Sequence, residues 1–395
     1  MKQARFYVLA GGEGRRMRPL TNLIPKPLLR FGPSARLMDF ALYNSLLSGA
    51  SEVNVLTQYR SELIERYLEE KWAPNFAEQG GRLSALPGVK SPMGTADALY
   101  RALAAEPEAS EYLIVLAADQ VYRMDYRPLL DFHRAHGRAA TVPVLDERHP
   151  LSGRGIYVFT RALVLPYLER NSGEAARDLD RDVFPQLLAD SQARAYPFPV
   201  ADQAPGFWRD VDDLVSYWRA QTDLLKDSAY LFLADPDASG PEPPLSLRHL
   251  AADSFSAERW VHNSLIADTA RIGEAMVEDS VIGPGAVIED GAVVRRSVIL
   301  DDAVVGKWTE LDSALVGPGL KIEQPSYAAL SFLPQAIPAA RPLADPPSEP
   351  LRAAGMRRNR KTGRPAITGA LESVLRQVAF RGPSSHPALA ASAKP

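Results

Sequence analysis

Glycines and basic residues near the start of the chain have the types and spacing of a phosphate-binding loop. The segment 9–16 (LAGGEGRR) directly follows the apolar residues 6–9, which are typical of a buried strand. Glycine has no Cβ, so the backbone can turn tightly here and expose its N–H groups. Those groups, together with nearby cations, would cradle the phosphates of a nucleotide. An ordinary glycine-rich turn is the alternative, and the candidate residues are Leu9, Ala10, Gly11, Gly12, Gly14, Arg16 and Lys26.

Two better-known glycine motifs do not fit this loop. A Walker loop needs Gly-Lys-Ser/Thr, but Gly14 is followed by Arg15. A dinucleotide fingerprint needs a third glycine three residues after Gly-x-Gly, and Met17 stands at that position. The loop therefore indicates a nucleotide site of another kind.

Two aspartates are candidates for holding a metal ion. Asp119 follows the apolar run 113–118, and Asp210 lies in the segment 207–211 (FWRDV). An Asp at the tip of a buried strand can bind Mg²⁺ through one oxygen while the ion keeps waters and substrate phosphates. Asp119 capping a turn is the alternative, and the spacing alone does not bring the two aspartates together.

A further candidate binding segment is 91–98 (SPMGTADA). Gly94 would let the backbone approach a flat ring, and Thr95 would cap a helix that runs through Leu99 and Leu103. A helix cap without any binding role is the alternative.

Composition limits the possible classes of protein. The 395 residues are 46% hydrophobic and 24% charged, which suits a globular protein of two domains. The net charge of -3 gives no basic field for nucleic acid, and the absence of cysteine excludes disulfides and thiolate chemistry. No apolar stretch approaches membrane-spanning length, and the first residues lead directly into a strand. We therefore expect no signal peptide, no membrane or nucleic-acid partner, and a cytoplasmic location.

The order of elements predicts two folded parts and a tail. Apolar strands alternate with helical patterns in residues 1–233, as in an α/β domain with a mostly parallel sheet. Residues 234–260 are predicted to be a linker. Residues 325–395 form a Pro/Ala-rich tail with one amphipathic helix around 371–378.

Residues 261–324 contain an internal repeat. Apolar residues recur every six positions, at Ala275, Val281, Val287, Val293, Ile299, Val305 and Leu311. A second series, Ile282, Ile288, Val294 and Leu300, keeps the same period one position on. This period predicts a left-handed parallel β-helix in which each hexapeptide forms one side. Because stacked rungs leave open ends, we expect this domain to mediate a homo-oligomer, with a hetero-oligomer as the alternative.

These motifs together resemble the sugar-1-phosphate nucleotidyltransferases, and the glucose-1-phosphate adenylyltransferase branch in particular. The branch is indicated by residues 31–49, by the GTADA of 94–98, by LAADQVY at 116–122 and by FWRDV at 207–211. The resemblance implies a Rossmann-like nucleotidyltransferase domain followed by a hexapeptide β-helix. It also implies Mg²⁺-dependent transfer of AMP from ATP to glucose-1-phosphate, a step of glycogen biosynthesis.

The same resemblance assigns roles to the candidate residues. The first loop and the segment Gly94, Thr95, Ala96 and Asp97 would bind the nucleotide, Arg16 and Lys26 would be catalytic, and Asp119 and Asp210 would hold the metal.

The chain departs from the family where the sugar phosphate would bind. The family has a Glu-Lys-Pro segment whose Lys holds that phosphate, whereas this chain joins the two neighbouring strands by residues 145–154 only. Arg148 or Arg154 is the candidate substitute. Further differences are Ala118 and Gln120 for Gly and His, Asp180 for Gly, and Asp212 and Asp213 for Gly-Thr.

These departures keep three alternatives open. The chain could use another sugar-1-phosphate, or it could be a non-catalytic subunit that binds nucleotide or assembles with an active one. An acyltransferase is a weaker alternative, because His262 is the one His of the coil and precedes its regular part.

Overall fold

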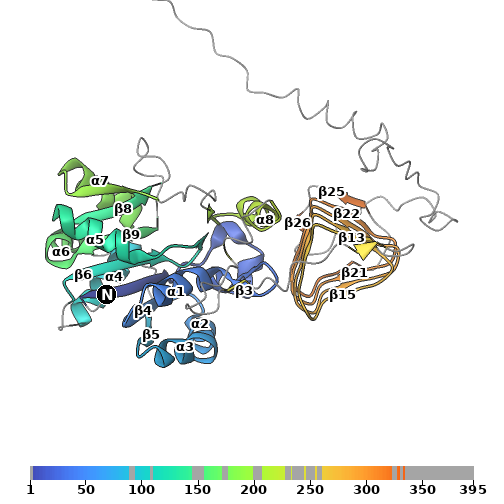
Figure 1. Cartoon of the computed structure of the whole chain (residues 1–395), viewed down its shortest axis with the longest axis horizontal. Helices are drawn as coiled ribbons and strands as arrows, with labels where there is room; N and C mark the ends of the chain where they lie inside the picture. Colours follow the sequence, from blue (N-terminus) through green and yellow to red (C-terminus); the bar gives the residue numbers. More distant parts are fainter. Residues whose placement is uncertain are drawn as a thin grey trace, which may run out of the picture. The chain divides into compact units, whose positions relative to one another are not determined.

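The computed structural model describes residues 3–88, 94–106, 110–144, 155–170, 177–198, 207–226, 233, 244–245, 254–255, 260–322, 327–329 and 332–333. In sequence order, an α/β unit is followed by a coil of short strands (Figure 1). Most of the expected linker, the tail from 334 with its expected helix, residues 91–93, Arg148 and Arg154 lie outside the described residues. The domain limits 1–233, 234–260, 261–324 and 325–395 therefore stay a prediction.

A seven-stranded sheet forms the centre of the first unit. Its order is β10-β8-β9-β6-β1-β4-β5, and β9 runs antiparallel to both of its neighbours while the other pairs are parallel. The expectation of a mostly parallel sheet is confirmed. The strands are β1 (Ala4–Ala10), β4 (Glu52–Thr57), β5 (Arg82–Pro87), β6 (Tyr112–Ala117), β8 (Ala140–Val144), β9 (Ile156–Thr160) and β10 (Ala193–Pro197).

Helices cover both faces of this sheet, as strand–helix alternation requires. One face packs against α4 (Thr95–Ala105), α6 (Arg161–Arg170) and α7 (Phe184–Ala189). The π-helical segment η5 (Leu179–Val183) directly precedes α7 and packs on the same face. The other face packs against α1 (Leu37–Leu47), α2 (Ser61–Tyr67), α3 (Ala73–Glu78) and α5 (Tyr126–His136), with the π-helical segment η4 (Leu68–Trp72) between α2 and α3. Alternation along β1 serves both faces, since Phe6 and Val8 enter one core and Tyr7 the other.

Helix α1 is buried on nearly all sides. Met38, Ala41 and Leu42 pack under the sheet, whereas Leu37 and Phe40 enter a second apolar cluster. That second cluster also contains Met17, Tyr217 of α8 (Leu214–Asp223), and residues of the coil. Helix α1 thus packs against the sheet on one side, and on the other side it shares an apolar cluster with Met17 and α8.

Short strands outside the main sheet place the second half of the site. Strand β11 (Trp208–Asp210) pairs antiparallel with β7 (Gln120–Tyr122), so Asp210 lies opposite Gln120. The hairpin β2 (Arg30–Phe31) and β3 (Ala35–Arg36) precedes α1, and the 3-10 turns η1 (Arg15–Met17), η2 (Leu20–Asn22) and η3 (Lys26–Leu28) follow β1.

The coil consists of three parallel sheets that stack turn upon turn. The first contains β14 (Leu265–Ile266), β17 (Val281–Ile282), β20 (Val298–Ile299), β23 (Leu315–Val316) and β26 (Phe332–Leu333). The second contains β13 (Trp260–His262), β16 (Met276–Glu278), β19 (Val293–Arg295), β22 (Glu310–Asp312) and β25 (Tyr327–Ala329), with β12 (Ser254–Phe255) antiparallel at its edge. The third contains β15 (Arg271–Ile272), β18 (Val287–Ile288), β21 (Val304–Val305) and β24 (Lys321–Ile322). The predicted hexapeptide β-helix is confirmed.

The spacing of six is not kept around a complete turn. Val277 pairs with Val294 and Val294 with Leu311, so each of these turns takes 17 residues rather than 18. The interior is filled by Ile282, Ile288, Val294, Ile299, Val305 and Leu311, while Val287 and Val293 of the expected series are only half-buried. One side of each turn is one residue short, and the inward phase shifts there.

A ladder of serines marks the corner before β17 and β20. Ser264, Ser280 and Ser297 are fully buried, and the N–H of Ser280 and of Ser297 each donates to the serine hydroxyl one turn earlier. The N–H of Ala314 donates to Ser297 Oγ at 3.0 Å. Buried backbone donors are costly when unsatisfied, so the hydroxyls satisfy donors at a corner where strand pairing stops.

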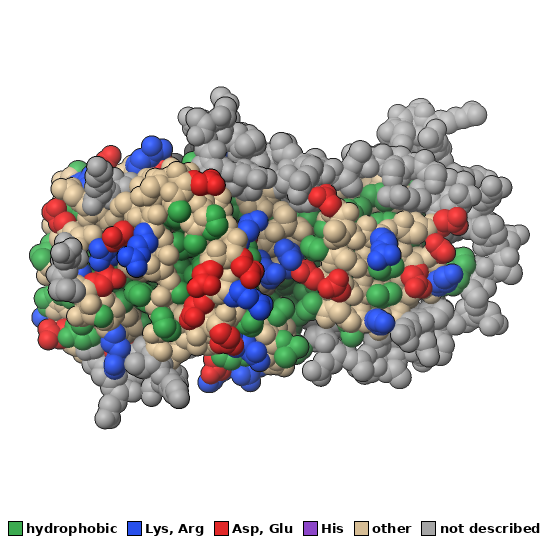
Figure 2. Space-filling model, turned by 90° about the horizontal axis from the view of Figure 1, so that it is seen from below, with side chains coloured by type: hydrophobic (Ala, Val, Ile, Leu, Met, Phe, Trp, Pro, Cys, Tyr) green, Lys and Arg blue, Asp and Glu red, His purple; other side chains and the backbone are tan. Residues whose placement is uncertain are grey.

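The surface carries both signs of charge. On the face in Figure 2, Lys and Arg side chains alternate with Asp and Glu side chains. Among the described residues, no helix combines the length and apolar character needed to cross a bilayer.

Candidate functional site

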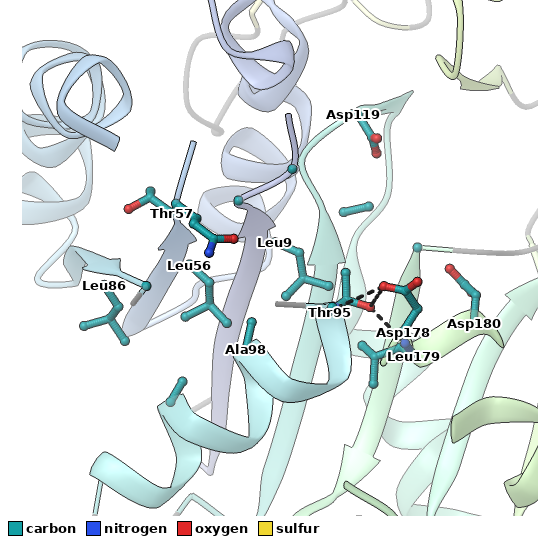
Figure 3. A pocket seen from close by; sticks show the side chains of 18 of the residues that line it. Leu9, Leu56, Thr57, Leu86, Thr95, Ala98, Asp119, Asp178, Leu179 and Asp180 are labelled. Carbon is teal, nitrogen blue, oxygen red and sulfur yellow. Dashed lines mark hydrogen bonds between the residues drawn. The ribbon is translucent and has the colours of Figure 1, made fainter. Parts of the chain in front are cut away.

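A cavity of about 610 Å³ opens at the carboxyl ends of β1, β4 and β5. Leu9, Leu56 and Leu86 come from these three strands and lie in a row, and Ala98 of α4 faces them (Figure 3). A smaller cavity of about 280 Å³ adjoins it and shares Leu9, Gly12, Arg16, Asp119 and Asp212 with it. Ligands of α/β sheets bind at this edge, so the glycine loop lies where a ligand is expected.

The three glycines of the loop have different reasons for lacking a side chain. Gly14 has φ of 60°, and a Cβ on it would lie 2.9 Å from the Lys26 Cβ. A Cβ on Gly11 would lie 3.2 Å from the Gln58 Cβ, whereas one on Gly12 would meet no atom within 4 Å. Gly14 is therefore needed by the loop itself, while Gly12 leaves open space that both cavities include. Ala10 and Gly14 line the smaller cavity, and Gly11 lines the larger one.

The two candidate cations are both held by carboxylates. Lys26 Nζ donates to Asp119 Oδ2 at 2.6 Å and lies 3.8 Å from Asp212 Oδ1. Arg16 donates two hydrogen bonds to Asp212, at 2.8 and 3.1 Å. Lys26 is buried, whereas the Arg16 side chain is 70% exposed. Alternating charges therefore line the small cavity in the order Asp119, Lys26, Asp212, Arg16.

Strand pairing brings the two candidate metal ligands to one cavity. Asp119 follows β6, and Asp210 ends β11, which pairs with the strand that starts at Gln120. The Val211 N–H also donates to the Asp119 carbonyl at 3.4 Å, which ties the two segments together. Sequence spacing did not predict this meeting, because more than eighty residues separate the strands that pair.

The two carboxylates suit a hard divalent cation. Mg²⁺ commonly uses one or two carboxylates and completes its shell with water and substrate phosphates. The described residues contain no cluster of three or more His, Cys, Asp or Glu arranged for a metal ion, so substrate oxygens would supply the other ligands. The donor set thus fits a metal that binds together with a phosphate substrate.

The Asp210 carboxyl has a raised pKa in this cavity. Protein atoms around the Asp210 carboxylate reduce its hydration, and the charges of Asp119 and Asp212 act in the same direction, so that its pKa is raised from 3.8 to about 6. Lys26 and Arg16 act in the opposite direction but do not cancel these effects. The side chain is nevertheless exposed toward the open cavity. An incoming cation would favour its ionised form.

The segment that begins α4 is placed differently from the expectation. Gly94 is the N-cap residue, and Thr95 is the first residue of the helix rather than its cap. The Thr95 hydroxyl instead accepts from the Leu179 N–H at 2.8 Å, and the Thr95 N–H donates to Asp178 Oδ1 at 3.2 Å (Figure 3). A Cβ on Gly94 would lie 1.9 Å from the Arg177 carbonyl oxygen, so this glycine is needed for close packing.

Only part of that segment reaches the cavity. Gly94 and Thr95 line it, whereas Ala96 is buried in the core between the sheet and α4, α6 and α7, and Asp97 is buried beside Arg101. The structure therefore does not bring Ala96 and Asp97 to the cavity with the rest of the predicted nucleotide site. Helical geometry explains this, since neighbouring residues point in different directions.

Several lining residues were not among the sequence candidates. Leu56 and Leu86 lie one residue before the ends of β4 and β5, and Ala98 and Ala102 lie on one face of α4. Ala98 and Ala102 are small residues four positions apart on a helix that follows a candidate binding motif. That spacing is the signal from which this wall of the cavity could have been predicted. Tyr157 also lines the cavity and donates its hydroxyl proton to Asp180.

Gln120 is part of the site wall rather than a free polar group. It is buried, and its Oε1 accepts from Trp208 Nε1 at 2.9 Å. A Cβ on Gly155 would lie 2.4 Å from Gln120 Nε2, so Gly155 makes room for this amide. The Gln120 amide of β7 therefore contacts Trp208 of β11 and lies against Gly155, the residue before β9.

Comparison with known proteins agrees with the fold. A nucleotidyl transferase family model matches residues 7–152, and a model of GlmU-like C-terminal hexapeptide repeats matches residues 249–327. The chain is thus a nucleotidyltransferase with a hexapeptide-repeat domain.

Full-length relatives narrow the class. Glucose-1-phosphate adenylyltransferase of Hydrogenovibrio crunogenus is 30% identical, over 70% of this chain and 77% of the relative. Those of Geobacillus stearothermophilus and Bacillus cereus strain Q1 are each 32% identical, over 70% of this chain and 83% and 86% of the relatives. The chain belongs to the glucose-1-phosphate adenylyltransferase family.

Proposed function

We propose that this chain transfers AMP from ATP to glucose-1-phosphate and releases pyrophosphate, the reaction that its relatives' name describes. The single observation that supports this most is that the glycine loop, Lys26, Asp119 and Asp210 border connected cavities at one sheet edge. ADP-glucose would be the product, for use in glycogen synthesis. The cytoplasm, where ATP is available, is the proposed compartment.

In this proposal the small cavity receives the triphosphate and the large cavity receives the nucleoside and the sugar. Gly12 leaves space next to the exposed loop backbone, and Arg16 and Lys26 would face phosphate oxygens. Leu56, Leu86 and Ala98 would form the apolar surface under the base. Asp119 and Asp210 would hold Mg²⁺, which would offset the charge on the α-phosphate and the leaving pyrophosphate.

The protein itself needs to make no covalent bond. An oxygen of the sugar phosphate would attack the α-phosphorus, and the bond from that phosphorus to the pyrophosphate oxygen would break. The chain's contribution is to hold both substrates in line and to stabilise the developing charge with fixed cations. Lys26 is well placed for this because its buried stem limits its motion.

A non-catalytic, nucleotide-binding subunit is the second candidate. Two observations favour it: Asp212 already pairs with Arg16, and Asp178 and Asp180 give the sugar end of the cavity negative charge. The shortened connection 145–154 lacks the Lys that the family uses for the sugar phosphate. Under this hypothesis the chain would bind nucleotide and assemble with an active relative.

One assay separates the two. Purified full-length protein is incubated with ADP-glucose, pyrophosphate and MgCl₂, and ATP formation is followed, with EDTA and with the Asp119→Asn variant as controls. ATP formation that needs the metal and Asp119 supports the enzyme. ATP binding by calorimetry without any turnover supports the subunit. A panel of other nucleoside diphosphate sugars then tests the preferred base and sugar.

We also propose that the coil mediates a homo-oligomer, with a hetero-oligomer as the alternative. Its stacked turns expose edge strands, and Trp308 at a corner is 38% exposed. Light scattering of the full chain at micromolar concentration measures the subunit number, and a monomer would contradict the proposal.

A further inference from the structure

Asp212 pairs with Arg16 and lies close to Lys26, the two cations that the proposed function assigns to the nucleotide's phosphates. Both of its carboxylate oxygens accept from Arg16, at 2.8 and 3.1 Å, and one oxygen lies 3.8 Å from Lys26 Nζ. The two-point contact fixes the plane of the guanidinium as well as its position. Phosphate oxygens entering this cavity would compete with a carboxylate that is already in place.

The backbone holds Asp212 at this position. The Asp212 N–H donates to Ser216 Oγ at 2.9 Å, at the first turn of α8, and the preceding Val211 N–H donates to the Asp119 carbonyl. Strand β11 fixes the chain on the other side. The backbone of Asp212 is therefore fixed at the cavity wall, and its 43% exposed side chain is positioned by the paired contact with Arg16.

Releasing Arg16 and Lys26 has an electrostatic cost in this cavity. If phosphates took both cations, Asp212 would lose its partners while Asp119 and Asp210 stay close to it. Uncompensated like charges in a partly enclosed site repel one another and repel the phosphates as well. A divalent cation held by Asp119 and Asp210 would remove that cost by supplying positive charge at the same place.

We propose that Asp212 makes nucleotide binding conditional on a divalent cation, because it holds Arg16 and keeps its negative charge close to Lys26 until a metal compensates that charge. This inference rests on the proposed assignment of the triphosphate to the small cavity. It makes Asp212 a specificity-determining residue that discriminates the metal-loaded nucleotide from the free nucleotide. Asp212 stands where the resembling family has Gly, so the device is a property of this chain's own residues.

Asp213 is a matched control for charge. It is the next residue, and its side chain accepts from the Ser216 N–H at 2.8 Å as the N-cap of α8. Asparagine is also a good N-cap residue, so Asp213→Asn removes one negative charge and keeps the helix start. Asp212→Asn removes the same charge from the ion pair with Arg16 and is close to isosteric.

The test measures ATP affinity of the full chain by calorimetry, without sugar phosphate, in MgCl₂ and in EDTA. The ratio of the two dissociation constants measures the coupling between metal and nucleotide. We expect Asp212→Asn to lower this ratio by at least about fivefold, a typical size for coupling between two ligands. The change should come from tighter ATP binding in EDTA, and Asp213→Asn should keep the wild-type ratio.

Two outcomes would overturn the inference. An unchanged ratio in Asp212→Asn would show that the ion pairs do not control binding, and weaker binding in MgCl₂ with no gain in EDTA would make Asp212 a metal ligand instead. Thermal melting verifies folding, and Asp212→Ser repeats the test if the Asn variant does not fold. If the wild type binds no ATP in either buffer, the proposed function itself fails, which is a different result from an unchanged ratio.

Discussion

Lys26 Nζ lies 2.6 Å from Asp119 Oδ2, and the two side chains are only 10% and 30% exposed. Lys26, which we expect to face the nucleotide's phosphates, thus forms an ion pair with Asp119, which we expect to bind the metal. Lys26 belongs to η3, and Asp119 follows β6, so the pair also fastens the loop after β1 to the sheet. A metal that takes an oxygen of Asp119 would compete with Lys26 and free it for a phosphate.

The first prediction concerns Asp119. Asp119→Asn should abolish metal-dependent ATP formation from ADP-glucose and pyrophosphate, because a neutral amide is a poor ligand for a hard cation. Lys26 is buried and loses its charged partner, so we expect a loss of about 1–3 kcal/mol in the free energy of unfolding. The assay and a melting curve are measured on the same sample. Unchanged turnover in the folded variant would remove Asp119 from the metal site.

The second prediction is a pH dependence from Asp210, whose pKa is raised from 3.8 to about 6 in the folded protein. Between these values the native state holds a proton that the unfolded state has lost, so this group lowers stability as pH rises. The penalty is small near pH 4 and fully present above about pH 6. Asp210→Asn should therefore melt higher than the wild type at pH 7.5, and the gap should close toward pH 4.

Adding metal gives the control for this pH effect. A cation bound at Asp119 and Asp210 favours the ionised carboxylate, so MgCl₂ should reduce the melting gap at pH 7.5. A gap that is equal at pH 4 and pH 7.5 would show that Asp210 does not titrate in this window.

Much of the site could be predicted from the sequence because it follows short motifs. Gly11, Gly12 and Gly14 come after a strand that alternation and apolar character identify, and they do border the cavities. The meeting of Asp119 and Asp210 could not be derived, since it depends on the pairing of β7 with β11. Long-range strand pairing leaves no local pattern in either segment.

The third prediction separates the roles of two glycines. Gly12→Ala should keep the wild-type melting temperature, because its Cβ meets no atom within 4 Å, and should weaken ATP binding, because the methyl group enters the ligand space. Gly14→Ala should destabilise the fold by about 1–2 kcal/mol, since φ is 60° there. Melting curves and ATP calorimetry of both variants are compared. Equal ATP affinity in Gly12→Ala and the wild type would contradict the assignment of the loop.

The fourth prediction concerns the serine ladder of the coil. Ser297→Ala leaves the buried Ala314 N–H without its acceptor, so we expect a loss of about 1–3 kcal/mol in the free energy of unfolding. Ser313→Ala is a control at the same corner one turn later, because the Ser313 hydroxyl donates to the half-buried carboxylate of its neighbour Asp312 at 2.9 Å. Urea unfolding with two probes measures both variants. Equal stabilities would show that the ladder contributes nothing.

The coil also shows where a sequence period can mislead. A repeat of six predicted the β-helix correctly and gave two series one position apart, of which Ile288 rather than Val287 fills the core. The turns of 17 residues shift the inward position from one series to the other, so that Ile299 of the first series is buried inside. Residues at the short corner adopt positive φ, as at Asp279, Arg296 and Ser313. Asp, Arg and Ser indicate a left-handed backbone less clearly than glycine does. The side of each turn that is one residue short could therefore not be located from these residues.

The last prediction is that this chain binds glucose-1-phosphate weakly while it binds ATP with metal. In the described part of the chain, Arg16 and Arg101 are the basic residues that line the large cavity, and Asp178 and Asp180 add negative charge to its wall. A charge-assisted contact to a phosphate is worth about 1.5–3 kcal/mol, and tenfold in affinity corresponds to about 1.4 kcal/mol. Losing the family's Lys should thus weaken sugar-phosphate binding by about ten- to a hundredfold.

Separate calorimetric titrations of ATP and glucose-1-phosphate in MgCl₂ test this, with the Geobacillus stearothermophilus relative as the reference protein. Asp180→Gly restores the residue of the resembling family, so it should strengthen glucose-1-phosphate binding and leave ATP binding unchanged. The matched variant Asp190→Gly removes a carboxylate that pairs with Tyr167 away from the cavity and should change neither affinity. Glucose-1-phosphate binding as tight as in the relative would show that another cation has replaced the Lys, and Arg148→Ala and Arg154→Ala would then identify it.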